Sequence, residues 1–192
     1  QVLAHAQPVT VVAWRPFADT PAHLLVCGDL AGAIHLWTVT QEPAATCVQT
    51  LVDHTTWVDG LAFAPDGRAL ASASYDGSVK LWSISTHAGA VAYAAHLYET
   101  LTVHMARVHR VAWSPDGHVL ATCSFDRTVW LWDVEQRTYR TPLQGHTAGV
   151  YDLAFTPDSS SLLSGSEDGT LRIWEVATGQ CAHVMKGYTR AL

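Results

Sequence analysis

The sequence has no run of Lys or Arg, and its 11 basic residues are outnumbered by 17 acidic ones, which gives a net charge of −6 at pH 7. Proteins that bind nucleic acid or anionic membrane surfaces usually present clustered basic residues, so we expect neither as a partner. No apolar stretch is long enough to span a membrane, and the first residues do not resemble a signal peptide. A signal removed before residue 1 stays open at this stage.

Cysteine is scarce, and the four cysteines are scattered without CxxC spacing: Cys27, Cys47, Cys123 and Cys181. Two fall on expected second strands and two on expected outer strands of the repeats described below. Buried free thiols in a reducing compartment are the preferred interpretation over disulfides, which predicts a cytoplasmic protein.

The short motifs of several chemical sites are also missing. The 11 histidines form no H-x₃-H motif and no Cys/His cluster. Asp66-Gly67 and Asp116-Gly117 are isolated turns rather than calcium loops, and there is no glycine-rich phosphate loop. We therefore expect no metal and no cofactor.

What the sequence does contain is one hairpin pattern, most clearly as LLSGSEDGTLRIW from Leu162 to Trp174. Two short strands with apolar residues on one face flank a tight turn that contains Asp and Gly. The pattern recurs as LASASYDGSVKLW, LATCSFDRTVWLW and, with departures, LVCGDLAGAIHLW, which end at Trp82, Trp132 and Trp37. Repetition at a period of 42 to 50 residues indicates a repeat architecture.

Each hairpin is preceded by a histidine, and an aromatic residue follows that histidine nine positions later. The histidines are His5, His54, His104 and His146, and the aromatics are Trp14, Phe63, Trp113 and Phe155. The segment between them is predicted to be the first strand of a unit, and the hairpin supplies the second and third. A fourth strand is expected near Thr46 to Val52, Tyr98 to Val103, Tyr139 to Leu143 and Cys181 to Met185.

Four short antiparallel strands per repeat are typical of a β-propeller blade. Over essentially its whole length the chain resembles the WD-repeat family, with His, a hydroxyl residue, Asp and Trp at matching positions and a literal Trp132-Asp133 dipeptide. The resemblance implies an all-β propeller of four blades in a single domain, at about 5–53, 54–103, 104–145 and 146–188. The first repeat departs from the pattern, since Cys27 and Ala31 replace the hydroxyl residue and the Asp, and Arg127 replaces a turn glycine in the third.

Both ends of the sequence look like parts of further repeats. Residues 185–189 resemble the start of another repeat, and residues 1–4 resemble the end of an outer strand. Four blades in an open arc would expose two apolar faces. We expect these faces to be covered by further repeats of a longer parent chain or by a second copy that closes a larger ring; closure of four blades alone ranks last.

The repeated His, hydroxyl and Asp sets could suggest a hydrolase, but one active site does not need three copies, and no G-x-S-x-G motif is present. The resemblance implies instead a hydrogen-bond chain inside each blade. Its members are His54, Ser72, Asp76 and Trp82; His104, Thr122, Asp126 and Trp132; and His146, Ser164, Asp168 and Trp174.

WD-repeat proteins often bind partners at the edge that carries the hairpin turns. Carried over by register, the resemblance gives Trp57, Asp59, Tyr75, Arg107, His109, Phe125, Tyr151 and Glu167, with Gly149 and, less securely, Pro8, Thr10 and Leu30. This set holds Trp, Tyr, Phe and Arg, the residue types enriched at interface hot spots. The competing interpretation is that Tyr75 and Phe125 only cover their own turns and that Trp57 shields the channel rim.

The predicted function is protein–protein recognition by a scaffold or sensor module, with a protein or peptide as partner and no enzymatic activity. By fold-level analogy, the parent could be a signalling protein. The alternative is a self-assembling unit whose copies close a larger ring. A hydrolase that uses one His/Ser/Asp set ranks third.

Overall fold

The computed structural model describes residues 5–16, 22–40, 45–86 and 93–187. In these ranges it contains sixteen strands and no helix, so the all-β prediction is confirmed. The predictions for residues 1–4 and 188–189 lie outside the described residues.

The strands form four sheets, each of four antiparallel strands that follow one another in chain order. The first sheet contains β1 (Val9–Trp14), β2 (His23–Asp29), β3 (Ala33–Val39) and β4 (Ala45–Val52). The second contains β5 (Val58–Phe63), β6 (Ala69–Ser74), β7 (Val79–Thr86) and β8 (Tyr93–Leu101). The third contains β9 (Val108–Trp113), β10 (Val119–Ser124), β11 (Val129–Asp133) and β12 (Thr138–Tyr139). The fourth contains β13 (Val150–Phe155), β14 (Ser161–Ser166), β15 (Thr170–Glu175) and β16 (Cys181–Lys186).

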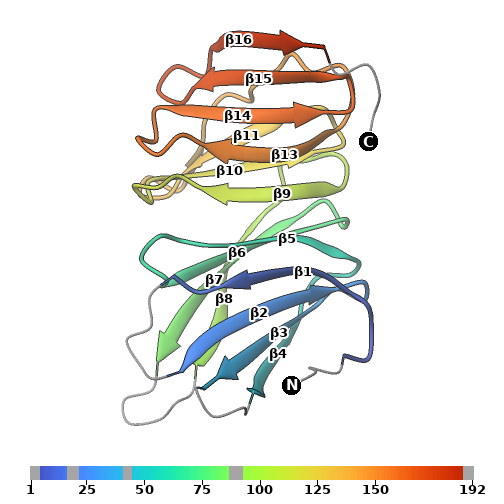
Figure 1. Cartoon of the computed structure of the whole chain (residues 1–192), viewed down its shortest axis with the longest axis vertical. Coiled ribbons are helices and arrows are strands. Elements are labelled where there is room, and N and C mark those ends of the chain that lie inside the picture. The colour runs from blue at the N-terminus through green and yellow to red at the C-terminus, as the bar shows by residue number, and fades with distance from the viewer. Residues whose placement is uncertain (1–4, 17–21, 41–44, 87–92, 188–192) are drawn as a thin grey trace.

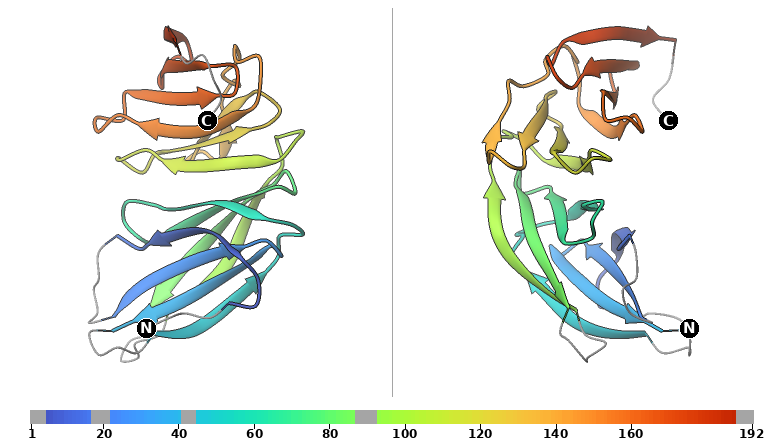
Figure 2. Two further views of the ribbon diagram at one scale, coloured as in Figure 1. Left: turned by 45° about the vertical axis from the view of Figure 1, so that its right-hand side comes forward. Right: turned by 90° about the vertical axis from the view of Figure 1, so that its left-hand side faces the viewer.

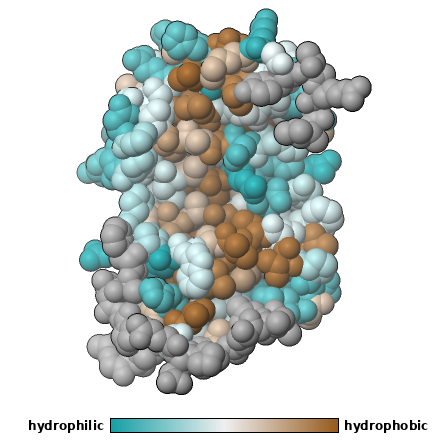
Figure 3. Space-filling model, in the orientation of Figure 1, coloured by the Kyte–Doolittle hydropathy of each residue, from teal (hydrophilic) through white to brown (hydrophobic). Residues whose placement is uncertain are grey.

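The sheets succeed one another along the long axis of the molecule (Figure 1). In the right-hand view of Figure 2 they follow an arc, with the first strand of each sheet on the concave side and the fourth strand on the convex side. In the space-filling view an apolar stripe runs along the side on which the first strands lie (Figure 3). This arrangement is that of consecutive blades of a β-propeller.

Tight turns predicted from Pro-Asp-Gly segments connect the first and second strands. Gly67 N–H donates to the Ala64 carbonyl and Gly117 N–H to the Ser114 carbonyl, each at 2.8 Å. In the β10–β11 turn, Arg127 adopts a φ of 74°, close to the 85° of Gly77 and the 77° of Gly169 at the same register position. A side chain in this left-handed region costs roughly 1 kcal/mol, so the third turn accepts strain that its counterparts avoid.

The apolar core lies between sheets rather than inside any one of them. Three clusters alternate along the arc, and each combines residues from two neighbouring sheets. Between the third and fourth sheets, for example, Leu131 packs in one cluster with Leu162 and Trp174, all at most 1% exposed. Each sheet therefore depends on its neighbours to bury its apolar faces.

Two expectations need correction. The fourth strand of the third sheet is only Thr138–Tyr139, followed by an isolated bridge between Val129 and Leu143, rather than a strand from Tyr139 to Leu143. All four cysteines are free, but only Cys27 and Cys123 are buried. Cys47 is exposed because outer strands face solvent, and burial raises the pKa of the Cys27 thiol to about 11.

Candidate interaction surface

A buried imidazole connects a turn to a strand in the second, third and fourth sheets. In the second sheet His54 Nδ1 lies 2.9 Å from Asp76 Oδ2, and His54 Nε2 lies 2.8 Å from Ser72 Oγ. The third sheet repeats these distances with His104, Asp126 and Thr122. The fourth has His146 at 2.9 Å from Asp168 and 2.7 Å from Ser164.

The tryptophan completes the chain in two of these three sheets. Trp82 Nε1–H donates to Ser72 Oγ at 2.9 Å, and Trp174 Nε1–H donates to Ser164 Oγ at 2.8 Å. Among the described residues no such bond joins Trp132 to Thr122. Trp132 instead packs edge-on against Tyr139, with ring centroids 4.6 Å apart. The expected four-residue chain therefore stops at the hydroxyl in the third sheet.

The aspartate carboxylates hold two stretches of backbone together. Asp76 Oδ2 accepts from Thr55 N–H before β5, and Asp76 Oδ1 accepts from Ser78 N–H and Ser78 Oγ–H in the β6–β7 turn. Burial alone would raise the pKa of Asp76, but the bonds from His54, Ser78 and Thr55 outweigh it and hold the pKa well below its usual range. The pKa values of Asp126 and Asp168 are lowered in the same way.

These sets do not have the arrangement of a hydrolytic triad. The hydroxyl-bearing residues Ser72, Thr122 and Ser164 are at most 3% exposed, and each hydroxyl already contacts an imidazole. A nucleophile must reach its substrate beside an oxyanion site, whereas these hydroxyls lie within the packed sheets. The geometry gives the hydrolase interpretation no support.

The first sheet replaces the missing aspartate with a different one. Asp29 is 3% exposed, and its Oδ1 accepts from the backbone N–H groups of Ala31 and Ala33, each at 2.9 Å. Its Oδ2 lies 3.0 Å from Nε2 of His35 on β3. His5 packs against the rings of His35 and Trp37 instead of bridging an Asp and a hydroxyl. Asp29 thus holds the first turn from two positions upstream of the expected one.

Each first strand carries a register shift at the same position. The pairing skips one residue near the start of β1, β5, β9 and β13. The skipped residues are Thr10, Asp59, His109 and Tyr151. A β-bulge re-aims the side chain of the extra residue, so all four sheets redirect one side chain at the edge formed by the hairpin turns.

Aromatic rings and one arginine join the turns of neighbouring sheets along this edge. Trp57 stacks on Tyr75 with centroids 5.0 Å apart and an interplanar angle of 22°. The Arg107 guanidinium lies over both Tyr75 and Phe125, at 5.0 and 4.8 Å from the ring centroids. Phe125 in turn contacts the backbone of Gly149 in the next sheet, where an added Cβ would come within 2.7 Å of the ring.

His109 connects this line of rings to the bulged residues. Its Nδ1 lies 3.0 Å from Asp59 Oδ2, and its ring centroid lies 4.5 Å from that of Tyr151 and 5.3 Å from that of Tyr75. The ring is 5% exposed, and Nε2 is buried without a hydrogen-bond partner. Asp59 therefore fixes the orientation of a ring on which three sheets meet.

We name the line formed by Trp57, Tyr75, Arg107, Phe125 and Tyr151 the aromatic edge. Trp57, Phe125 and Tyr151 are 42%, 39% and 41% exposed, so the edge is accessible although its members touch one another. Tyr75 and Phe125 do more than cover their own turns, because each contacts a residue from another sheet.

Acidic residues border the aromatic edge. Limited solvation and the Glu167 carboxylate raise the pKa of the Tyr151 hydroxyl, while Arg107 lowers it. Arg110, which the register argument did not select, donates from Nη1 to the Asp59 carbonyl at 2.6 Å and lies 3.6 Å from Asp152.

The three residues selected in the first repeat do not extend the aromatic edge. Pro8 is exposed and Leu30 partly exposed, and neither is aromatic. The Thr10 hydroxyl donates to the Gly28 and Val58 carbonyls and so connects the first two sheets.

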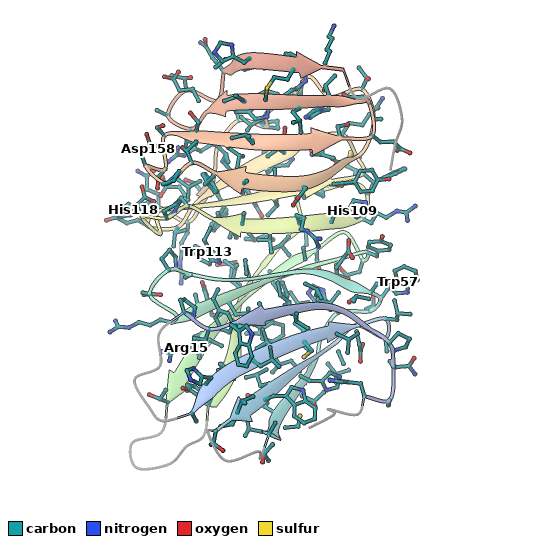
Figure 4. The ribbon with its side chains drawn as sticks, viewed as in Figure 1. Arg15, Trp57, His109, Trp113, His118 and Asp158 are labelled. Atoms are coloured by element: carbon teal, nitrogen blue, oxygen red, sulfur yellow. The ribbon has the colours of Figure 1, made fainter. Side chains whose placement is uncertain are left out.

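Figure 4 shows Trp57 and His109 at one edge of the sheets, and Arg15, His118 and Asp158 at the opposite edge. Within the described ranges, no group of three or more His, Cys, Asp or Glu side chains could hold a metal ion. Nothing in these ranges forms a helix with the length and apolarity that a membrane crossing requires.

The fold and the repeated networks define a repeat protein of the β-propeller class. The family model described as "WD domain, G-beta repeat" (WD40) matches residues 45–83, 96–133 and 136–175, which is more than half of the chain. The chain belongs to the WD40 repeat family. The matches leave out β1 to β3, where the first repeat lacks the hydroxyl and the aspartate in register.

Curated relatives include fungal nuclear distribution proteins. The chain is 33% identical over 81 residues to nuclear distribution protein PAC1 of Arthroderma otae. The match covers 42% of this chain and 17% of that protein. It is 33% identical over 78 residues to nuclear distribution protein nudF of Aspergillus flavus, which covers 41% of this chain and 16% of that protein. The matched segment thus spans about a sixth of the length of these relatives.

The networks predict a loss of stability in acid. The pKa values of Asp76, Asp126 and Asp168 are lowered from 3.8, so the unfolded chain binds protons first as the pH falls. Their stabilisation is complete above 3.8 and is lost as the pH drops through that value towards the folded pKa. Burial lowers the pKa of His146 from 6.5, so the unfolded chain also binds a proton there first, and this adds a loss of stability that begins below pH 6.5.

Urea unfolding at about pH 7, 5 and 3 should show this decline, because stability falls wherever the unfolded state binds more protons. The Asp168→Asn variant should be less stable at pH 7 and show a shallower dependence below pH 4. Asp53→Asn, which changes an exposed carboxylate outside the networks, is the control and should follow the parent chain. A free energy of unfolding that stays constant from pH 7 to 3 would contradict the assignment.

Proposed function

We propose that the chain is a protein-interaction module that binds a protein or peptide partner through the aromatic edge. The observation that carries this proposal is the continuous contact from Trp57 to Tyr151 through rings of three sheets, with three of its aromatic side chains about two-fifths exposed. Exposed Trp, Tyr, Phe and Arg side chains that are already held in place lose little conformational entropy on binding.

The finer parts of the proposal are a scaffold or sensor role in a signalling assembly, no enzymatic activity, and a cytoplasmic location. The buried hydroxyls of the His–Asp sets support a non-enzymatic role. The free thiols of Cys27, Cys47, Cys123 and Cys181 support a reducing compartment.

The test compares proteins captured from a lysate by the parent chain and by a Trp57→Ala, Tyr151→Ala double variant. Loss of two interface hot spots should reduce specific partners by about tenfold or more in quantitative mass spectrometry. His118→Ala, at the opposite edge, is the matched control and should capture the same proteins as the parent. Equal capture by the double variant would refute the proposed surface.

A second candidate function is self-assembly, and a comparison of equivalent positions favours it. Leu36, Leu81 and Leu131 precede the repeat tryptophans and are at most 1% exposed, because each packs in a cluster shared with the next sheet. Ile173 holds the same position in the fourth sheet and is partly exposed.

The first sheet shows a corresponding difference on the face that, in the other sheets, packs on the preceding sheet. Leu70, Leu120 and Leu162 are fully buried against the preceding sheet, whereas the equivalent Leu25 is partly exposed. The face of the fourth sheet that carries Ile173 is thus of the type that packs on the next sheet elsewhere in the arc. The face of the first sheet that carries Leu25 is of the type that packs on the preceding sheet. We infer that the fourth sheet of one copy can pack on the first sheet of another.

Light scattering coupled to size exclusion tests this candidate at about 10 to 100 μM protein, a range in which modest interfaces are populated. The unsubstituted chain should be a dimer, and the Ile173→Asp variant should be monomeric because it places a charge in an apolar contact. Met105→Asp, at a 94% exposed position, should stay dimeric. A monomeric parent chain would rule out self-assembly and leave the aromatic edge unaffected.

A further inference from the structure

Arg107 differs from Arg110 and His109, its basic neighbours in the sequence, because it is held in place but not neutralised. Its guanidinium carbon lies over the rings of both Tyr75 and Phe125, at 5.0 and 4.8 Å from their centroids, and these rings belong to turns of neighbouring sheets. Cation–π contact with two rings restricts the positions that the guanidinium can adopt. The side chain is nevertheless exposed to solvent.

The neighbouring basic groups already have acidic partners. Arg110 lies 3.6 Å from Asp152, and His109 lies 3.0 Å from Asp59. Among the described residues, by contrast, no carboxylate lies within ion-pair distance of Arg107, and its side chain donates no hydrogen bond. A guanidinium has five N–H donors in a planar fork, so the donors of Arg107 stay available to a ligand.

A planar fork of unpaired donors fits a carboxylate, which accepts two parallel hydrogen bonds in the plane of the guanidinium. The charges around it favour a single negative charge over a phosphate. Glu167 and Arg107 both shift the pKa of the Tyr151 hydroxyl, in opposite directions. The Asp59 carboxylate contacts His109, whose ring packs against Tyr151. Phosphate-binding surfaces use clusters of Arg to balance two negative charges, whereas the aromatic edge contains a single Arg, and the carboxylates of Glu167 and Asp59 act on Tyr151 and His109 there.

We propose that Arg107 receives the carboxylate of a Glu or Asp side chain in a partner peptide, and that apolar residues of the same peptide lie on Trp57 and Tyr151. The proposal rests on the proposed function, since it assigns the chemistry that the aromatic edge recognises. Arg107 supplies specificity for the acidic residue, and the exposed rings on either side supply most of the buried area.

The test begins with a phage-displayed library of random peptides, selected on the immobilised full chain. Enriched sequences should share one Glu or Asp with aromatic or large aliphatic residues close to it. The tightest peptide is then synthesised in three forms, with Glu, Gln or phosphoserine at the shared acidic position, and its Kd is measured against the parent chain and variants.

Replacing Glu by Gln in the peptide, or Arg107→Gln in the chain, should each weaken binding by about tenfold or more, as for charge-assisted bidentate pairs. The two changes together should cost little more than either alone, because they remove the same contact. Arg107→Lys should recover only part of the loss, since it restores the charge without the planar fork. His118→Ala should bind as the parent chain does.

Several outcomes would overturn the proposal. Peptides that depend on Trp57 but share no acidic residue and ignore Arg107→Gln would refute carboxylate recognition and leave the proposed function intact. Phosphoserine that binds about tenfold tighter than Glu would replace the carboxylate by a phosphate. Binding that is unchanged by Trp57→Ala would refute the proposed function itself, and failure to enrich any peptide would count against both.

Discussion

The structure depends on an imidazole that is buried between a carboxylate and a hydroxyl inside the sheet. In the fourth sheet, His146 joins Asp168 of the β14–β15 turn to Ser164 of β14, and Ser164 also accepts from Trp174 on β15. The same carboxylate accepts from the backbone N–H of Thr147, which lies before β13. One network therefore connects the entry to the first strand, the hairpin turn and the two central strands. Because its groups are buried and satisfy one another, breaking one bond leaves unpaired polar atoms in the core, and the turn stays in one geometry.

Turns fixed in this way can present side chains with precision. The apolar clusters between sheets set the spacing of successive turns, and a bulge at the start of each first strand directs one further side chain to the same edge. At this edge Arg107 lies just before β9 and His109 near its start, and together they contact rings from the second, third and fourth sheets. The aromatic edge is thus a consequence of repetition. Equivalent positions in neighbouring repeats come within contact distance because the sheets stack along one arc, and their chemistry differs because each repeat places a different residue there.

The sequence was sufficient to predict the hairpins and the four-stranded units, because each has a fixed spacing from a tryptophan or a histidine. The hydrogen-bonded sets were implied by the resemblance to WD repeats, which placed their His, hydroxyl and Asp members where the structure shows their bonds. The sequence did not predict the bulges. Asp59 and His109 are each the extra residue of a bulge. In Val58-Asp59-Gly60, for example, nothing in the sequence shows that Asp59 is skipped, because the bulge is defined by the pairing of Val58 and Gly60 with β6. The sequence also missed the role of Asp29, whose carboxylate replaces the absent turn aspartate from β2 and reaches His35 on β3. Trp132 shows the opposite limit. It stands at the expected position, but a short fourth strand brings Tyr139 against it, and its bond to the hydroxyl is lost.

The most direct test of the central network is the free energy of unfolding of Ser164→Ala compared with that of Ser160→Ala. Removal of Ser164 Oγ leaves the Trp174 indole N–H and His146 Nε2 unpaired inside the fourth sheet, so Ser164→Ala should lose about 1 to 3 kcal/mol. Ser160 is exposed and its hydroxyl bonds to the exposed Asp158, so its variant should stay within about 0.5 kcal/mol of the parent chain. Equal stability of the two variants would contradict the claim that the buried network holds the sheets and, with them, the aromatic edge.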